Sequence, residues 1–198
     1  MDTRERLIRQ STRQFAEKGF YGTSIASIAE AIGISKQALL HHFGSKEALY
    51  AAVLVRISDD ALARCRSIDD EASTAEENLE AVIVDHYRNA MNKTAEAKLL
   101  MRELLDNEPR AAGSESWFLK SYLDGLVRTL RKVDGFSSYS SSQALVVVYQ
   151  LLGAANYFCL SMPTLRKMYG AKNFDTAREA YENELVALVR ARLDKGRP

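Results

Sequence analysis

The sequence is poor in the residues that build metal sites, disulfide frameworks and covalent catalytic centres. Its 198 residues include only two cysteines and three histidines. Cys65 and Cys159 lie in apolar helical patterns without metal-type spacing, so we interpret both as buried structural thiols of a protein in the reducing cytoplasm. The sequence shows no nucleophile–base pair, carboxylate pair or phosphate-cradling glycine loop. We therefore expect no catalytic residue, no metal site and no cofactor, and we expect that the protein is not an enzyme.

Proline is also scarce, and no alternating apolar–polar segment is long enough to force a β-sheet. The three prolines stand at positions 109, 163 and 198. Apolar residues recur instead at three- and four-residue spacing along almost the whole chain, which is typical of α-helices. We predict an all-α protein of about nine helices, with a three-helix N-terminal domain at residues 1–50 and a larger helical domain at residues 51–198.

Strong net charge is absent as well, since the formal charge is +1, which argues against a general polyanion binder. The charge is unevenly distributed, because residues 1–56 carry 8 Lys/Arg against 5 Asp/Glu and residues 57–80 carry 2 against 8. No secretory segment is evident at the N-terminus, so we expect a cytoplasmic protein. The apolar run 144–160 is shorter than the ~20 residues of a membrane span and contains Gln150 and Asn156. We predict a buried interface helix there.

The most informative segment runs from Gly19 to Leu49, where two short helical patterns are separated by a glycine. In the first pattern, apolar residues share one face, and Thr23 or Ser24 can cap its start. Gly33 can adopt the left-handed conformation that ends a helix and turns the chain. Ser35 can cap the second pattern. The inward residues of the first pattern are Ile25, Ile28, Ala29 and Ile32.

The second pattern buries Leu39 and Phe43 while it turns polar donors outward, as a helix in the major groove of DNA requires. Ser45 can cap the following helix, which starts at Lys46. This order of helix, glycine turn and second helix predicts a helix-turn-helix DNA-binding unit.

The same segment resembles the N-terminal DNA-binding domain of the tetracycline-repressor (TetR) family of transcriptional regulators. The resemblance covers roughly residues 4 to 55. Two positions depart from the usual pattern: Gln37 stands where glycine is frequent, and Leu40 stands where an aromatic residue, commonly tyrosine, contacts phosphate. The matching words are Phe15-Ala16-Glu17-Lys18-Gly19-Phe20, Thr23-Ser24-Ile25, Ile28-Ala29, Gly33-Ile34-Ser35-Lys36, His42-Phe43 and Ser45-Lys46-Glu47-Ala48-Leu49.

We assign base contacts to Lys36 and Gln37, because lysine can donate to guanine and glutamine can pair with adenine. His41 can contact either a base or a phosphate. His42 can anchor phosphate or pack against the domain interior, and a metal site at the two histidines is disfavoured because successive helical residues point about 100° apart. The complete predicted DNA-binding set is Tyr21, Thr23, Ser35, Lys36, Gln37, His41, His42 and Lys46.

The last two helical patterns predict a dimer. The apolar run 144–160 needs cover on two sides, and the final helix can pack against it and against the same pair from a second copy, which predicts a twofold homodimer. Such a dimer would read an inverted-repeat operator on double-stranded DNA.

The resemblance further implies that residues 51–198 bind a small-molecule effector, which we expect to release a repressor from its operator by shifting the helix that starts at Lys46. The candidate ligand residues combine apolar bulk with polar groups, although ordinary core or interface positions are the alternative for each. They are His86, Met101, Trp117, Tyr122, Asn156 and Tyr157. A protein partner of the C-terminal domain and, less plausibly, an all-α enzyme are the rival functions.

Overall fold

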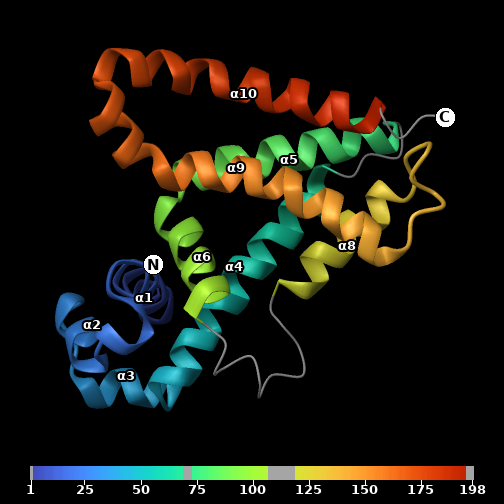
Figure 1. Ribbon diagram of the computed structural model, residues 1–198. Helices are drawn as coiled ribbons and strands as arrows, with labels where there is room; N and C mark the ends of the chain where they lie inside the picture. The colour runs from blue at the N-terminus through green and yellow to red at the C-terminus, as the bar shows by residue number, and fades with distance from the viewer. Residues whose placement is uncertain (1, 69–72, 107–118, 195–198) are drawn as a thin grey trace. The chain divides into compact units, whose positions relative to one another are not determined.

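The computed structural model describes residues 2–68, 73–106 and 119–194, and within these ranges the chain forms nine α-helices and no strand (Figure 1). The all-α prediction is therefore confirmed. The helices pack into two compact units, one formed by the described residues of 1–60 and 93–118 and the other by those of 61–92 and 119–198. These units group the chain differently from the predicted domains 1–50 and 51–198, which remain a prediction.

The first unit contains α1 (Thr3–Gly22), α2 (Ile25–Ala31), α3 (Lys36–Phe43), the first part of α4 (Lys46–Ile68) and α6 (Thr94–Asp106). Serine caps start three of these helices: Ser24, Ser35 and Ser45 accept hydrogen bonds from backbone N–H groups three residues later. Each cap satisfies a donor that a helix start leaves without a partner. Short polar residues therefore set the beginnings of α2, α3 and α4.

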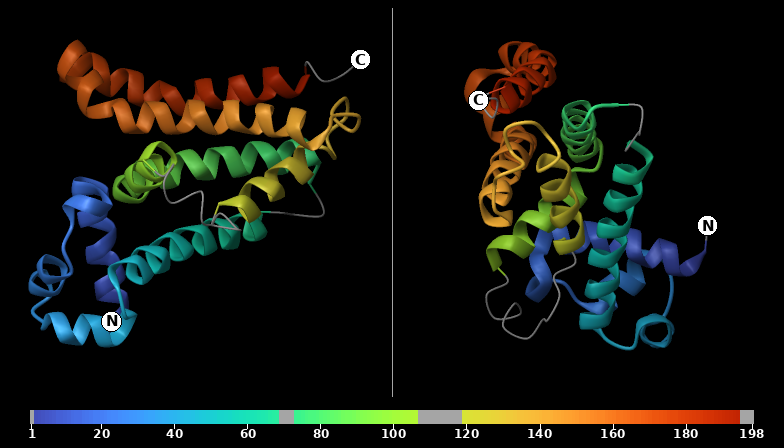
Figure 2. Two further views of the ribbon diagram at one scale, coloured as in Figure 1. Left: turned by 60° about the horizontal axis from the view of Figure 1, so that its bottom comes forward. Right: turned by 90° about the vertical axis from the view of Figure 1, so that its right-hand side faces the viewer.

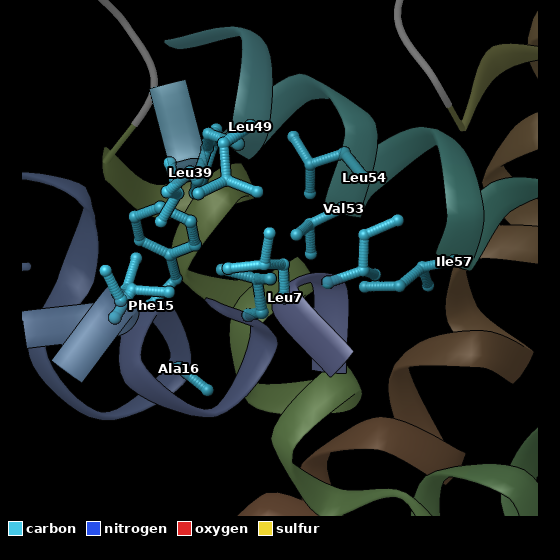
Figure 3. Close-up of a cluster of buried hydrophobic side chains, with 13 residues drawn as sticks. Leu7, Phe15, Ala16, Leu39, Leu49, Val53, Leu54 and Ile57 are labelled. Carbon is cyan, nitrogen blue, oxygen red and sulfur yellow. The ribbon is translucent and has the colours of Figure 1, made fainter. Parts of the chain in front are cut away.

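The core of this unit joins the apolar faces of all five helices, as Figure 3 shows for eight of its members. Of the inward residues predicted for α2 and α3, Ile28, Ala29 and Leu39 are buried here. Ile25, Ile32 and Phe43 are partly buried at its edge. The fully or nearly fully buried members are Leu7, Ile8, Phe15, Ala16, Ile28, Ala29, Leu39, Leu49, Tyr50, Val53, Leu54, Ile57 and Leu99.

Helix α6 packs against α1 although more than 70 residues separate them in the sequence. Two leucines near the end of this helix face solvent: Leu104 is 43% exposed and Leu105 is 75% exposed. The residues that α6 buries are Ala97, Leu99 and Glu103. The buried Glu103 carboxylate accepts a hydrogen bond of 2.5 Å from the Tyr50 hydroxyl of α4, which supplies the polar partner that a buried acid requires.

The second unit is a bundle of α5 (Ala75–Asn92), α8 (Lys120–Leu130), α9 (Ser141–Tyr169) and α10 (Ala171–Asp194), joined by the last part of α4. Helices α9 and α10 form a long antiparallel hairpin, with α5 packed against both and α8 against α5 and α9 (Figure 2). Aromatic rings fill the junction of α5, α9 and α10, where Tyr181 stacks on Phe158 at a centroid distance of 3.7 Å.

Helix α9 is longer than predicted. It begins with a capping box between Ser140 and Gln143 and continues through Pro163. By length and composition it is the one described helix that is apolar enough to cross a membrane, although the core helix of a soluble protein passes the same test. Packing on α5, α8 and α10 buries a third of its most apolar stretch. The remaining apolar surface of α9 faces outward in the single chain.

Candidate nucleic-acid interface

The turn between α2 and α3 depends on a glycine in the left-handed region. Gly33 has a φ of +73°, and its N–H donates to the Glu30 carbonyl while the Ile34 N–H donates to the Ala29 carbonyl. These two bonds satisfy carbonyls at the end of α2, as expected for a glycine-terminated helix. Ile34 then lies partly buried against the core, and Ser35 starts α3 at once. The turn thereby fixes the angle between α2 and α3.

Helix α3 separates an inward residue from an outward polar face. Leu39 is completely buried, and Phe43 is partly buried beside it. The other face exposes four residues that we predict to contact DNA, namely Lys36, Gln37, His41 and His42. Both histidines are exposed, so the alternative that His42 packs into the domain interior is wrong. All four side chains can therefore donate hydrogen bonds to a ligand outside the domain.

Two further predicted contacts lie around α3. Tyr21 is 77% exposed, and Lys46 stands at the start of α4 with its Nζ 4.4 Å from the centroid of the Phe20 ring. Phe20 and Tyr21 themselves make an edge-to-face ring contact. Ser35 is exposed, but its hydroxyl already accepts the Ala38 N–H, so Ser35 serves first as the cap of α3.

Thr23 departs from this group, because only 2% of its surface is exposed. Its hydroxyl donates to the carbonyls of Gln14 and Gly19, at 3.1 and 2.8 Å, and so closes the end of α1. Ser24, rather than Thr23, caps α2. We correct the prediction for Thr23 accordingly, since its side chain presents no surface to a phosphate, and we leave it out of the proposed interface.

Helix α6 supports the interface in a way that the sequence did not indicate. The guanidinium of Arg102 donates to the carbonyls of Ala16 and Glu17, at 3.0 and 3.3 Å. These carbonyls come just before the break at Gly19, where φ is +73°. A cation at the carboxyl end of a helix is favourable because helix dipoles place negative partial charge there. No local sequence signal pairs an arginine with carbonyls 85 and 86 residues away.

Three predicted ligand residues form one hydrogen-bonded chain in the second unit. His86 of α5 lies with Nε2 3.0 Å from Asn156 Oδ1 of α9 and with Nδ1 3.1 Å from the Tyr122 hydroxyl of α8. Because a carboxamide oxygen can only accept, His86 carries its proton on Nε2, and Nδ1 accepts from Tyr122. Burial lowers the pKa of His86 and raises that of Tyr122. Both groups are therefore neutral near pH 7.

The other three predicted ligand residues do not join this chain. Met101 belongs to α6 of the first unit, and its assignment stays a prediction. Tyr157 is 78% exposed on the outer face of α9, so its side chain does not join the hydrogen bonds of His86. Helical spacing explains this, because Tyr157 points about 100° away from its neighbour Asn156. Trp117 lies outside the described residues.

The cysteines and acids of the described residues offer no other centre. Cys159 is buried, and burial raises the pKa of its thiol to about 11, which makes it unreactive near neutral pH. In the part of the chain that the structure describes, no three His, Cys, Asp or Glu side chains are grouped as metal ligands.

Comparison with known sequences identifies the helix-turn-helix segment. Residues 7–53 match the family described as "Bacterial regulatory proteins, tetR family". The HTH-type transcriptional regulator RutR of Escherichia coli O157:H7 is 33% identical over 114 residues, which cover 56% of this chain and 51% of RutR. The HTH-type transcriptional regulator UidR of Escherichia coli K12 is 41% identical over 64 residues, or 32% of this chain and 33% of UidR. The chain thus aligns with about half or less of the length of these relatives, both of which are HTH-type transcriptional regulators.

Comparison with solved structures extends the likeness of fold to nearly the whole chain. A TetR-family transcriptional regulator from Bordetella parapertussis has a TM-score of 0.71 and 21% identity, with 95% of this chain and 94% of that chain covered. The fatty acid degradation regulator FadR from Bacillus halodurans has a TM-score of 0.68 and 18% identity, with 99% and 95% covered. At these sequence identities the structural match supports only a shared fold.

Proposed function

We propose, from the premise that this chain is a member of the tetR family of bacterial regulatory proteins, that it is a dimeric repressor released from a palindromic operator by a small molecule. The observation that carries the DNA-binding part is the exposed donor face of α3, held in place by the buried Leu39 and the turn at Gly33. A short helix of this kind fits the major groove, where base edges distinguish all four base pairs.

Within this interface, Lys36 and Gln37 read base edges, while Tyr21, His42 and Lys46 hold phosphates and fix the register of the helix. Each good base contact contributes roughly 1–3 kcal/mol of discrimination against a wrong base. Because both readers stand in the first turn of α3, a change at these two positions alters sequence preference more than it alters general affinity for DNA.

The test is selection of bound fragments from a random duplex pool with the full chain, followed by the same selection with the double variant Lys36→Ala/Gln37→Ala. We expect the wild type to select an inverted repeat and the double variant to lose that preference while it keeps residual binding. Lys132→Ala, which removes an exposed lysine of the second unit, is the control and keeps the wild-type preference. An unchanged selected sequence in the double variant would contradict the assignment of base readers.

Dimerisation is proposed through the outer faces of α9 and α10. Four outward positions of α9 fall on one helical stripe, namely Val146, Tyr149, Gly153 and Tyr157, and α10 adds the exposed Leu188. Exposed apolar area of this kind marks an association surface, and twofold pairs are the commonest homo-oligomers. The pair would place its two recognition helices about 34–36 Å apart, one turn of DNA.

Sedimentation tests this surface directly. Tyr149→Glu, which places a charge in the middle of the stripe, should sediment as a monomer and lose operator binding. The matched variant Val55→Glu, on an exposed position of α4, should remain a dimer. A wild-type chain that sediments as a monomer at micromolar concentration would overturn the dimer.

The effector region is proposed around His86, Tyr122 and Asn156, because three helices bring neutral hydrogen-bonding groups together there. Helix α4 can transmit the effect of a bound effector to the DNA-binding unit, since residues 46–60 belong to the first unit and residues 61–68 to the second. A hundredfold loss of operator affinity requires about 2.7 kcal/mol of differential ligand binding, which lies within the usual range of coupling energies. Native mass spectrometry of the purified chain should show a small bound mass that Asn156→Leu loses; retention of that mass by the variant would refute this location.

A further inference from the structure

Two basic side chains beside α3 are held against aromatic rings. The guanidinium carbon of Arg4, on α1, lies 5.2 Å from the centroid of Phe43, the last residue of α3. The Lys46 ammonium, on α4, lies 4.4 Å from the Phe20 ring. Such contacts attract a cation to the ring face without neutralising its charge. Arg4 is thereby positioned at the carboxyl end of α3 while it stays exposed to solvent.

Neither cation forms an ion pair with a carboxylate of the described residues. By contrast, Arg56 of the same unit is bound by both Glu5 and Asp60. A phosphate that approached Arg56 would have to compete with two carboxylates. Arg4 can accept a phosphate without losing an ion pair, so its charge is available to a polyanion.

Helix α3 also lacks a hydrogen-bond donor at one of its positions. Leu40 is partly buried and has no polar group, so it contributes nothing to phosphate binding. His42, the neighbour of Phe43, is exposed on the same end of α3, with its ring 6.4 Å from the Phe43 ring. The Arg4 guanidinium over Phe43 therefore lies near His42, a predicted phosphate anchor. Leu40 offers no donor at this end of α3.

We propose that Arg4 is a phosphate-contacting residue of the DNA interface and that, with Lys46, it clamps the DNA backbone at the end of α3. This inference rests on the proposed DNA-binding function. Arginine suits the task because its guanidinium is always charged and can bind two phosphate oxygens at once. The contact is to the backbone, so it raises affinity for every duplex and carries no sequence information.

The experiment measures the affinity of the full chain for its selected operator and for an unrelated duplex by fluorescence anisotropy over a range of salt concentrations. Arg4→Gln keeps a long polar side chain but removes the charge, and Arg4→Lys restores the charge. Arg9→Gln is the matched control, because Arg9 is another exposed arginine of the same helix. Circular dichroism confirms that each variant is folded.

We expect Arg4→Gln to weaken binding about eightfold per head at 0.1 M salt, or about sixtyfold for a dimer, on both duplexes alike. The slope of log affinity against log salt should become shallower by about 0.9 for each lost phosphate contact, or about 1.8 for two heads. Arg4→Lys should recover the slope. Arg9→Gln should match the wild type.

Three results would overturn the role of Arg4: an unchanged slope in Arg4→Gln, an equal change in Arg9→Gln, or a loss confined to the operator. Failure of Arg4→Lys to recover the slope would count against it in the same way. These outcomes differ from a failure of the proposed function itself, which would appear as a wild-type chain that binds no duplex at any salt concentration.

Discussion

Replacing Gly33 by alanine isolates the backbone cost of the turn that orients α3. The φ of Gly33 is +73°, and a Cβ added there would meet no atom within 4 Å, so the variant introduces no clash. Placing an L side chain in the left-handed region costs roughly 1–2 kcal/mol. The reduced freedom of the unfolded chain offsets about 0.4–1 kcal/mol of that cost. We therefore expect a net loss of about 1 kcal/mol, which for a chain of this size lowers the melting temperature by about 2–4 °C.

The assay is thermal and urea unfolding of the wild type, Gly33→Ala and Gly33→Asn, with hydrogen exchange to locate the loss in α2 and α3. Asparagine tolerates positive φ better than alanine, so Gly33→Asn should lose less stability. Gly125→Ala is the control, and we expect it to raise the free energy of unfolding where Gly33→Ala lowers it. Gly125 lies inside α8, where a Cβ would meet its nearest neighbour at an ordinary 3.9 Å, so alanine should add about 0.5–1 kcal/mol of stability.

A Gly33→Ala chain as stable as the wild type would refute the reasoning, because it would mean that the turn does not need a left-handed residue. A loss in Gly125→Ala equal to that in Gly33→Ala would refute it too, since the effect would then come from the added methyl group rather than from φ. The same Gly33→Ala chain should bind the operator more weakly, because the turn sets the position of α3 against α2.

Three further outcomes are expected. Leu99→Ala should lower the free energy of unfolding by about 2–5 kcal/mol in urea, because Leu99 is 1% exposed in the core of the first unit, whereas Leu105→Ala should change it by less than about 0.5 kcal/mol. Tyr122→Phe should lose about 1–3 kcal/mol at neutral pH, since it leaves His86 Nδ1 buried without a donor; no loss would disprove the hydrogen bond. Burial lowers the pKa of His86, so below about pH 6.5 the unfolded chain binds a proton that the folded chain does not, and stability should fall with pH by up to about 1.36 kcal/mol per unit. His86→Gln should abolish that part of the slope in unfolding measurements from pH 8 to 5.

The helix-turn-helix segment could be predicted because its determinants are local. Apolar spacing placed Ile28, Ala29 and Leu39 inside, and the structure buries all three. The caps at Ser35 and Ser45 and the left-handed Gly33 also follow from neighbouring residues. For the caps and the turn, the hydrogen-bond partner lies within five residues along the chain, so the sequence pattern contains the whole interaction.

Predictions failed where two candidates were locally equivalent or where the partner was remote. Thr23 and Ser24 could both cap α2, and the choice depends on the carbonyl of Gln14 that takes the Thr23 hydroxyl. Tyr157 and Asn156 are neighbours with similar polar character. Only the packing of α9 on α5 decides that Asn156 meets His86 while Tyr157 faces out.

By itself, the sequence determined which segments are helices, where several of them start, and that the N-terminal segment carries an outward donor face, because these features depend on spacing and on short-range hydrogen bonds. Only the tertiary structure decided that α6 completes the core of the first unit, that Arg102 holds the end of α1, and that His86, Tyr122 and Asn156 share one chain of hydrogen bonds. These hydrogen bonds join residues that are 36 or more positions apart. No helical period relates such distant residues, so their meeting depends on how whole helices pack.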